Sequence, residues 1–200
     1  MDSTIITDPF IYVADDILAP TKCKEIIDRF EQRKEQQRPG ETGLGLRTDI
    51  KDSTDLKVDF HPDDWKDVTN IFKECVSNLF NQYVTHLSNA GNFYNFSNNT
   101  YTSLTPPNTE SMMDTGYQIQ RTYPGKGYIW HHDNEDYRLL TFIVYLNTVD
   151  EGWTQFYTGN QVEPVVGRGL IFPATWTYFH QGYPPKQTKY IMTGWLHEPH

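Results

Sequence analysis

Residues 128–147 read YIWHHDNEDYRLLTFIVYLN, and this stretch decides how the second half of the chain is interpreted. Aromatic and β-branched residues dominate both of its ends, which is typical of strands. Because successive side chains of a strand point to opposite faces, His131 and Asp133 share one face and His132 points away from it. A facial iron site needs a histidine and a carboxylate from one strand and a second histidine from elsewhere. We therefore predict that His131 and Asp133 are metal ligands and that His132 is not.

The second histidine ligand must come from a distant strand. His180 lies in the strand-like run YFHQGYP and is the strongest candidate. The remaining histidines lie near the ends of predicted helices or at the C-terminus, where no strand pattern turns them inward: His61, His86, His197 and His200.

A lysine on the final predicted strand indicates a bound anion. Lys189, Ile191, Thr193 and Trp195 alternate along KYIMTGWL and share a face. A lysine that faces the interior of a β-barrel is costly without a negatively charged partner, and a dicarboxylate co-substrate would supply one. Lys186 is the competing residue, but the turn PPKQ leaves it in solvent. We assign Lys189 and Thr193 to the predicted co-substrate site.

Two tyrosines are predicted to lie near the same anion. Thr141, Ile143 and Tyr145 share a face of the strand RLLTFIVYLN, so the phenol of Tyr145 can join Lys189. The alternation of YQIQRTY from residue 117 brings Tyr123 towards the same cavity. Packing in the core is the alternative interpretation for either tyrosine.

The remaining pattern predicts a single domain over residues 1–200, in the α+β class and mainly β. A short strand and two helices are expected within 1–91, the second helix over residues 61–91 with apolar residues at i, i+3 and i+4. Residues 92–115 are a long segment, predicted to be a mobile or functional loop, a possible lid, or an unrecognised strand. Eight short strand-like runs over 116–200 predict a jelly roll, a cupin-like double-stranded β-helix, buttressed by the N-terminal helices.

The composition narrows the possible partners. The net charge of −9 argues against a nucleic-acid partner, since such binding relies on clustered lysine and arginine. Cys23 and Cys75 lie at apolar helical positions and are predicted to be buried free thiols. The sequence has no signal-peptide pattern and no apolar run that would span a membrane, so an intracellular, soluble protein is expected.

The ordered motifs of residues 117–196 resemble the catalytic core of Fe(II)/2-oxoglutarate oxygenases of the prolyl 4-hydroxylase branch. The segment TYPGKGYIWHHDN is similar to the Tyr-Pro-Gly…His-x-Asp-Asn stretch of the hypoxia-sensing prolyl hydroxylases. The segments RLLTFIVYLN, EGWTQF, GRGLIFP, FHQGYPP and TKYIMTGWL follow in the order of that family. Trp153 stands where the family usually has a second glycine, and Lys189 replaces the arginine of the animal oxygen sensors.

The resemblance implies a role for each matching residue. His131, Asp133 and His180 would hold Fe(II), and 2-oxoglutarate and O2 would be the co-substrates, with ascorbate as a reductant. Lys189 and Tyr145 would bind the distal carboxylate of 2-oxoglutarate, and Tyr123 would lie near its chelating end. The residues that would line the substrate pocket are Tyr128, Arg138 and Trp195.

Hydroxylation of a prolyl residue in a peptide or protein is the function that this resemblance favours. A hydroxylase of a free amino acid or small metabolite is the nearest alternative. A cupin-type metalloprotein that does not use 2-oxoglutarate would explain His131, Asp133 and His180 but not Lys189. A catalytically inactive binding module on the same scaffold is the last alternative, because a fold does not by itself specify a function.

Overall fold

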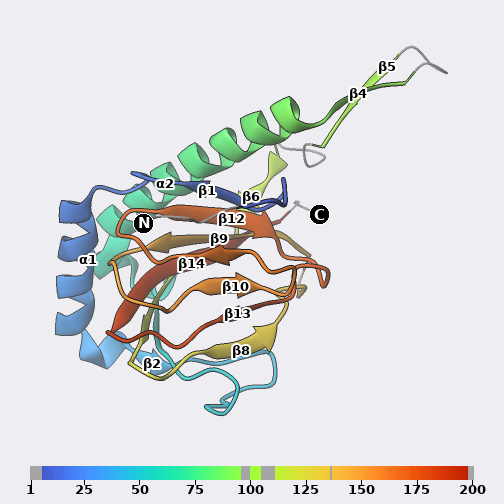
Figure 1. Cartoon of the computed structure of the whole chain (residues 1–200). Coiled ribbons are helices and arrows are strands. Elements are labelled where there is room, and N and C mark those ends of the chain that lie inside the picture. Colours follow the sequence, from blue (N-terminus) through green and yellow to red (C-terminus); the bar gives the residue numbers. More distant parts are fainter. Residues whose placement is uncertain (1–5, 96–99, 105–110, 136, 198–200) are drawn as a thin grey trace.

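The computed structural model describes residues 6–95, 100–104, 111–135 and 137–197. Two antiparallel sheets face each other, and two helices cover the outer face of the larger sheet (Figure 1). The larger sheet has the order β1-β12-β9-β14-β7-β3-β2, and β6 pairs with β14. Its strands are β1 (Tyr12–Ala14), β2 (Arg38–Pro39), β3 (Thr54–Lys57), β6 (Met113–Asp114), β7 (Gln118–Thr122), β9 (Arg138–Tyr145), β12 (Gly169–Pro173) and β14 (Lys189–His197).

The smaller sheet carries the central motif of the sequence. Its order is β11-β10-β13-β8, which places the strand of His131 beside the strand of His180. Its strands are β8 (Tyr128–His131), β10 (Thr154–Phe156), β11 (Gln161–Val162) and β13 (His180–Gly182). This arrangement confirms the predicted double-stranded β-helix of the mainly β, α+β class.

The helices form where the apolar periodicity predicts them. Helix α2 (Pro62–Ala90) starts with a proline in its first turn and ends at Gly91, whose N–H donates to the carbonyl of Leu87. Helix α1 (Pro20–Gln32) also begins with its proline, so Thr21 lies inside the helix and does not cap it. Two short 3₁₀ helices precede β2 and α2: η1 (Lys34–Gln36) and η2 (Val58–Phe60). Among the described residues, no helix combines the length and apolarity that crossing a membrane requires.

The side chains of strand β9 alternate between two apolar clusters, one on each face of the larger sheet. Phe142 and Val144 point to the helices and join a core that includes Phe30 of α1 and Phe72 of α2. On the opposite face, Ile143 packs between the sheets, in a second cluster that includes Tyr145, Phe156, Leu170 and Phe172. The inner faces of β9 and β14 therefore form the floor of the space between the sheets.

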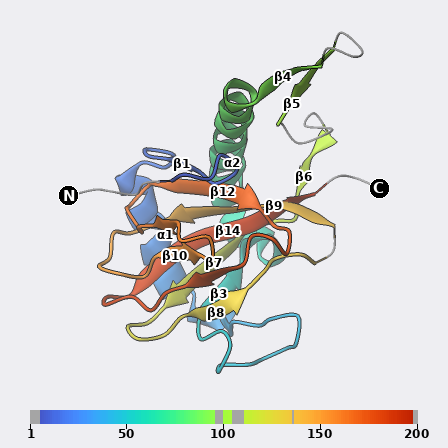
Figure 2. The same cartoon turned by 45° about the vertical axis from the view of Figure 1, so that its right-hand side comes forward.

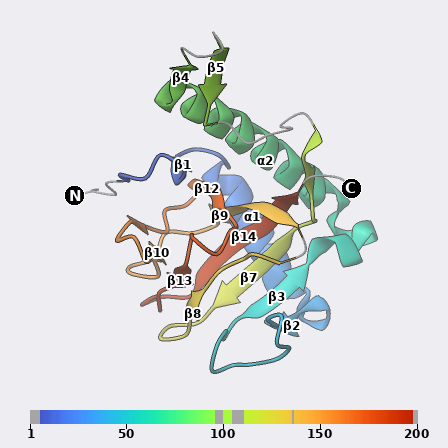
Figure 3. The same cartoon turned by 90° about the vertical axis from the view of Figure 1, so that its right-hand side faces the viewer.

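The described part of residues 92–115 contains strands, which was one of the three alternatives predicted for this segment, and the possible lid stays a prediction. Strands β4 (Asn92–Asn95) and β5 (Thr100–Ser103) pair as a hairpin that stands away from both sheets at the end of α2 (Figures 1 to 3). Strand β6 continues the larger sheet at the end of β14. The polar composition that suggests a loop is equally compatible with a short two-stranded ribbon.

A glycine on β14 permits close packing at the centre of the larger sheet. A Cβ atom added to Gly194 would lie 2.4 Å from the carbonyl oxygen of Gly116 and 2.6 Å from Cζ of Phe142. We expect Gly194→Ala to destabilise the protein by about 1–3 kcal/mol, because backbone and a buried ring must move. Denaturant unfolding would measure the loss. Gly182→Ala is the matched control, since its Cβ would meet Tyr128 only at 3.6 Å, an ordinary contact.

Candidate metal centre and adjoining cavity

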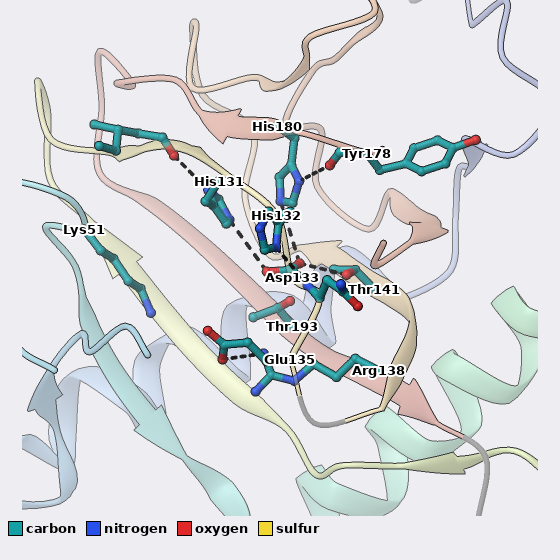
Figure 4. Close-up of polar contacts among 12 residues, drawn as sticks. Lys51, His131, His132, Asp133, Glu135, Arg138, Thr141, Tyr178, His180 and Thr193 are labelled. Carbon is teal, nitrogen blue, oxygen red and sulfur yellow. Dashed lines mark hydrogen bonds and ion pairs between the residues drawn. The ribbon is translucent and has the colours of Figure 1, made fainter. Parts of the chain in front are cut away.

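Two histidines and one aspartate converge between the sheets (Figure 4). His131 ends β8, His180 begins β13, and the two are directly paired across the strands. The Nε2 atoms of His131 and His180 each lie 3.7 Å from a different oxygen of Asp133. One ligand atom from each residue falls within 4.8 Å of the others, which is close enough for all three to bind one ion. His132 is exposed and contributes no atom to this group.

Main-chain hydrogen bonds select the tautomer of both histidines. Nδ1 of His131 lies 2.8 Å from the carbonyl oxygen of Ile129, and Nδ1 of His180 lies 2.9 Å from that of Tyr178. A carbonyl only accepts, so each Nδ1 carries the proton and each Nε2 presents a lone pair to the common point. A second partner that orients a ligating imidazole in this way is typical of metal sites.

The charge states also suit a cation. Burial, and then the neighbouring His180, lower the pKa of His131 to about 3, so its imidazole is neutral at pH 7. Burial alone would raise the pKa of Asp133, but His180 and His131 lower it below its usual range. Thr141 adds a hydrogen bond of 2.7 Å from its hydroxyl to Oδ2 of Asp133. Two imidazoles and one oriented carboxylate are the donor set of non-haem Fe(II) sites, so these residues fit the metal.

The two histidines and the aspartate, which we call the metal group, open into one cavity of about 780 Å³ that extends across the inner face of the larger sheet. Lys189, Ile191, Thr193 and Trp195 all line it, as the alternation of β14 predicts. Lys189 is 5% exposed, and its ammonium donates to the carbonyl oxygen of Gly152 at 2.8 Å. Burial lowers the pKa of Lys189 to about 8, the consequence of a cation with no anion beside it.

Of the two residues predicted to accompany Lys189, Thr193 lines the cavity and Tyr145 does not. Thr193 lines the cavity and donates its hydroxyl to the carbonyl oxygen of Phe142 at 2.9 Å. Tyr145 is fully buried behind the wall, and its hydroxyl shares a hydrogen bond of 2.7 Å with the hydroxyl of Thr154. Thr154 is the residue of this pair that lines the cavity. Tyr145 thus lies behind Thr154, and its predicted contact with 2-oxoglutarate stays a prediction.

The prediction that Tyr123 lies in the cavity is wrong. Tyr117, Ile119 and Arg121 do share a face, but that face of β7 turns to the helices, where Tyr117 packs against Phe72. Tyr123 lies beyond the end of the strand and is 49% exposed, with the guanidinium of Arg121 at 4.7 Å from its ring centre. Alternation shows which residues share a face, but it does not show which face is inside.

The three predicted substrate-pocket residues all line the cavity. The ring of Tyr128 stacks on His131 with the ring centres 3.5 Å apart. The guanidinium carbon of Arg138 lies 3.7 Å from the centre of the Trp195 ring, so each holds the other in place. Aromatic and cationic groups thus border the metal on the side facing the open cavity.

A buried ion pair in the cavity was not predicted. The ammonium of Lys51 lies 2.6 Å from Oδ2 of Asp55 and 5.7 Å from the centre of the Tyr128 ring. The main chain beside Lys51 pairs with β8, since the N–H of Ile129 donates to the carbonyl of Ile50 at 2.9 Å. The only signal in the sequence is a lysine four residues before an aspartate in a polar stretch, which is typical of an exposed pair.

Comparison with known proteins supports the same assignment. Residues 117–197 match the sequence model of the 2OG-Fe(II) oxygenase superfamily. None of the curated proteins matches the sequence.

Three solved structures have a similar fold at low identity. A prolyl-4-hydroxylase from Pseudomonas putida is 16% identical with a TM-score of 0.68, covering 94% of this chain and 93% of that one. A Trichoplax adhaerens prolyl hydroxylase in complex with a hypoxia inducible factor peptide fragment is 16% identical with a TM-score of 0.71, covering 95% and 84%. A viral collagen prolyl hydroxylase from Paramecium Bursaria Chlorella virus-1 is 18% identical with a TM-score of 0.61, covering 96% and 97%.

The family match and the geometry concern the same residues. The matched region contains the two histidines, the aspartate and Lys189. The matched superfamily uses Fe(II), 2-oxoglutarate and O2, so the sequence match and the geometry of residues 117–197 point to the same chemistry.

Proposed function

We propose that this protein hydroxylates a prolyl residue within a peptide or protein, converting 2-oxoglutarate and O2 to succinate and CO2. The observation that carries the proposal is one continuous cavity, lined by the metal group, a buried lysine and the set formed by Tyr128, Arg138 and Trp195. Ascorbate is proposed as the reductant that keeps the metal ferrous.

Each part of the cavity has a separate task in this proposal. His131, Asp133 and His180 would hold Fe(II), which when bound supplies the activation of O2 that hydroxylates a C–H bond. Lys189 would pair with the distal carboxylate of 2-oxoglutarate, with Thr154 and Thr193 as further polar contacts on the same wall. Because the lysine is buried, this ion pair would form away from water and fix the orientation of the co-substrate.

The substrate would enter on the side of the stacked aromatic residues. The ring of Tyr128 and the Arg138–Trp195 pair present flat surfaces to a ring such as that of proline. The Trichoplax adhaerens protein, which shares the fold, is a prolyl hydroxylase seen with a peptide fragment, and this supports a peptide as the substrate class. The segment that borders this side is the loop after β2, through Glu41 and Leu46.

A peptide-array screen tests the proposal. We expect proline-containing peptides, incubated with the protein, Fe(II), 2-oxoglutarate and ascorbate, to gain one oxygen atom and to raise succinate formation. Mass spectrometry of the peptides is the measurement, and His131→Ala is the control. If no peptide in a broad screen gained oxygen while free amino acids or small metabolites did, the prolyl-peptide substrate would be wrong and the oxygenase assignment would stand.

A further inference from the structure

The larger sheet continues beyond the metal as an uninterrupted polar surface, which we call the polar shelf: Gln118 and Gln120 of β7 with Asp55 and Lys57 of β3. Asp55 pairs in register with Gln120, and Lys57 pairs with Gln118. All four residues line the same cavity as the metal group. Exposure rises from the buried Asp55 through the half-buried glutamines to the exposed Lys57, so the shelf leads from the cavity to solvent.

The shelf is not required by the packing of the sheet. The intervening residues Leu56 and Ile119 point to the helices and are fully buried in the core. The shelf side carries no apolar group at these positions. Half-buried amide side chains in a cavity are suited to binding a polar ligand, because an amide offers both donors and an acceptor.

The two glutamine amides touch and form one polar strip along β7. Nε2 of Gln120 donates to Oε1 of Gln118 at 3.3 Å, which uses one donor of the first and the carbonyl of the second. Among the described residues these two amides make no other hydrogen bond, so Gln118 offers its N–H groups and Gln120 its carbonyl. Their Cα atoms stand roughly 6.6–6.8 Å apart along β7, so the strip follows the strand and an extended chain can lie along it.

The buried part of the shelf carries no unpaired charge. Asp55 is already paired with Lys51 at 2.6 Å and accepts from the hydroxyl of Ser53 at 2.7 Å. Lys57 stands at the exposed end of the shelf, with its ammonium 5.3 Å from the centre of the Phe60 ring. A ligand lying over the two glutamines and Asp55 meets donors and acceptors whose one charge is already paired, which fits a peptide main chain better than an acidic or basic group.

We propose that the polar shelf binds the main chain of the polypeptide substrate, in extended conformation, on one side of the residue that is hydroxylated. This inference rests on the proposed prolyl-peptide function and adds the segment of substrate and the residues that recognise it. It implies a substrate that is selected by length and main-chain hydrogen bonding on that side more than by side-chain identity.

The test compares a double variant with a matched control. Gln118→Leu/Gln120→Leu removes both amides at similar volume. Gln181→Leu removes one member of another half-buried pair, in which Nε2 of Gln181 donates to Oε1 of Gln155 at 2.7 Å and neither residue lines the cavity. We expect the double variant to raise the KM for a long peptide substrate about tenfold, mostly without a loss of kcat. We expect Gln181→Leu to leave it unchanged.

Peptide chemistry separates main-chain binding from a general loss of shape. A series of peptides would each carry one N-methylated amide, at a different flanking position. In the wild type, methylation at one of these positions should raise the KM. In the double variant, the same methylation should cause little further increase. A truncated peptide without that flank should have the same KM with both proteins. Equal KM values of the wild type and the double variant for the long peptide would overturn the inference. A wild-type KM that does not depend on peptide length or methylation would overturn it as well. Peptide hydroxylation itself would still stand in both cases. Absence of any hydroxylated peptide with the wild type would instead remove the proposed function and this inference with it.

Discussion

We expect Lys189→Met to weaken 2-oxoglutarate binding by about a hundredfold or more, because it would remove the buried cation that we propose as the partner of the distal carboxylate. The same change should stabilise the protein in the absence of 2-oxoglutarate. Burial lowers the pKa of Lys189 from 10.5 to about 8, a penalty on the order of 3 kcal/mol. Methionine avoids this penalty and loses only the hydrogen bond to Gly152, worth about 1 kcal/mol. Thermal unfolding should therefore shift upwards by a few degrees.

The pH dependence of stability and of 2-oxoglutarate affinity tests the role of Lys189 independently of the substitution. The folded-state pKa of Lys189 is below its unfolded value, so the destabilisation is complete below pH 8 and disappears as the pH rises towards 10.5. A carboxylate needs the charged lysine, so 2-oxoglutarate affinity should fall above pH 8 by up to about tenfold per pH unit. Calorimetry in buffers of different ionisation enthalpy would measure the proton taken up on binding.

Lys186→Met is the matched control for these measurements. Lys186 is exposed and pairs with Glu151 at 2.8 Å, outside the cavity lining. Both its 2-oxoglutarate affinity and its unfolding temperature should remain close to those of the wild type. Undiminished affinity in Lys189→Met would show that the anion binds elsewhere in the cavity.

His131→Ala should lower metal affinity and turnover by at least about a hundredfold, more than the loss of an outer partner of a metal ligand usually costs. His132→Ala should retain both, because the ring of His132 is exposed and only accepts a long hydrogen bond of 3.3 Å from the N–H of Asn134. Binding of Mn(II), as a redox-stable substitute, can be followed by calorimetry. It should also stabilise the wild type by about 2.7 kcal/mol when the ion is at a hundred times its Kd.

Adjacent histidines make this comparison a direct test of the strand geometry. His131 ends β8 and His132 directly follows it, so both variants remove an imidazole at the same end of the strand and test the direction of each side chain. Equal losses of metal affinity would mean that the two side chains do not point to opposite faces and that the ligand assignment is wrong.

Local alternation and the order of motifs are sufficient for part of the site. The face shared by Lys189, Thr193 and Trp195 depends only on the period of a strand. Strand β8 ends at His131, so Asp133 reaches the site from the segment just beyond the strand and not by alternation alone. The resemblance of residues 117–196 then supplies the topology that brings β8 and β13 together. The predicted ligand roles still await the metal-binding measurements described above.

The remaining features depend on tertiary contacts that no local pattern contains. Tyr123 shares its parity with Ile119, and only the position of α1 and α2 decides that this face is covered. The buried pair of Lys51 and Asp55 looks like an exposed one in the sequence, because burial is imposed by the pairing of residue 51 with β8. The hairpin formed by β4 and β5 stands away from both sheets, and its short strands lie in a stretch whose composition is typical of a loop.

The bonds that orient the two candidate histidine ligands have a consequence for how such a site diverges. In both cases the acceptor is a main-chain carbonyl two residues before the histidine, at positions 129 and 178. Every amino acid supplies that carbonyl, so no side-chain replacement at these positions can delete it. The two acceptors that orient the histidines therefore depend on the path of the backbone. The side chains at positions 129 and 178 can change without removing them. Sequences only 16–18% identical can retain such an arrangement as long as the fold itself is kept.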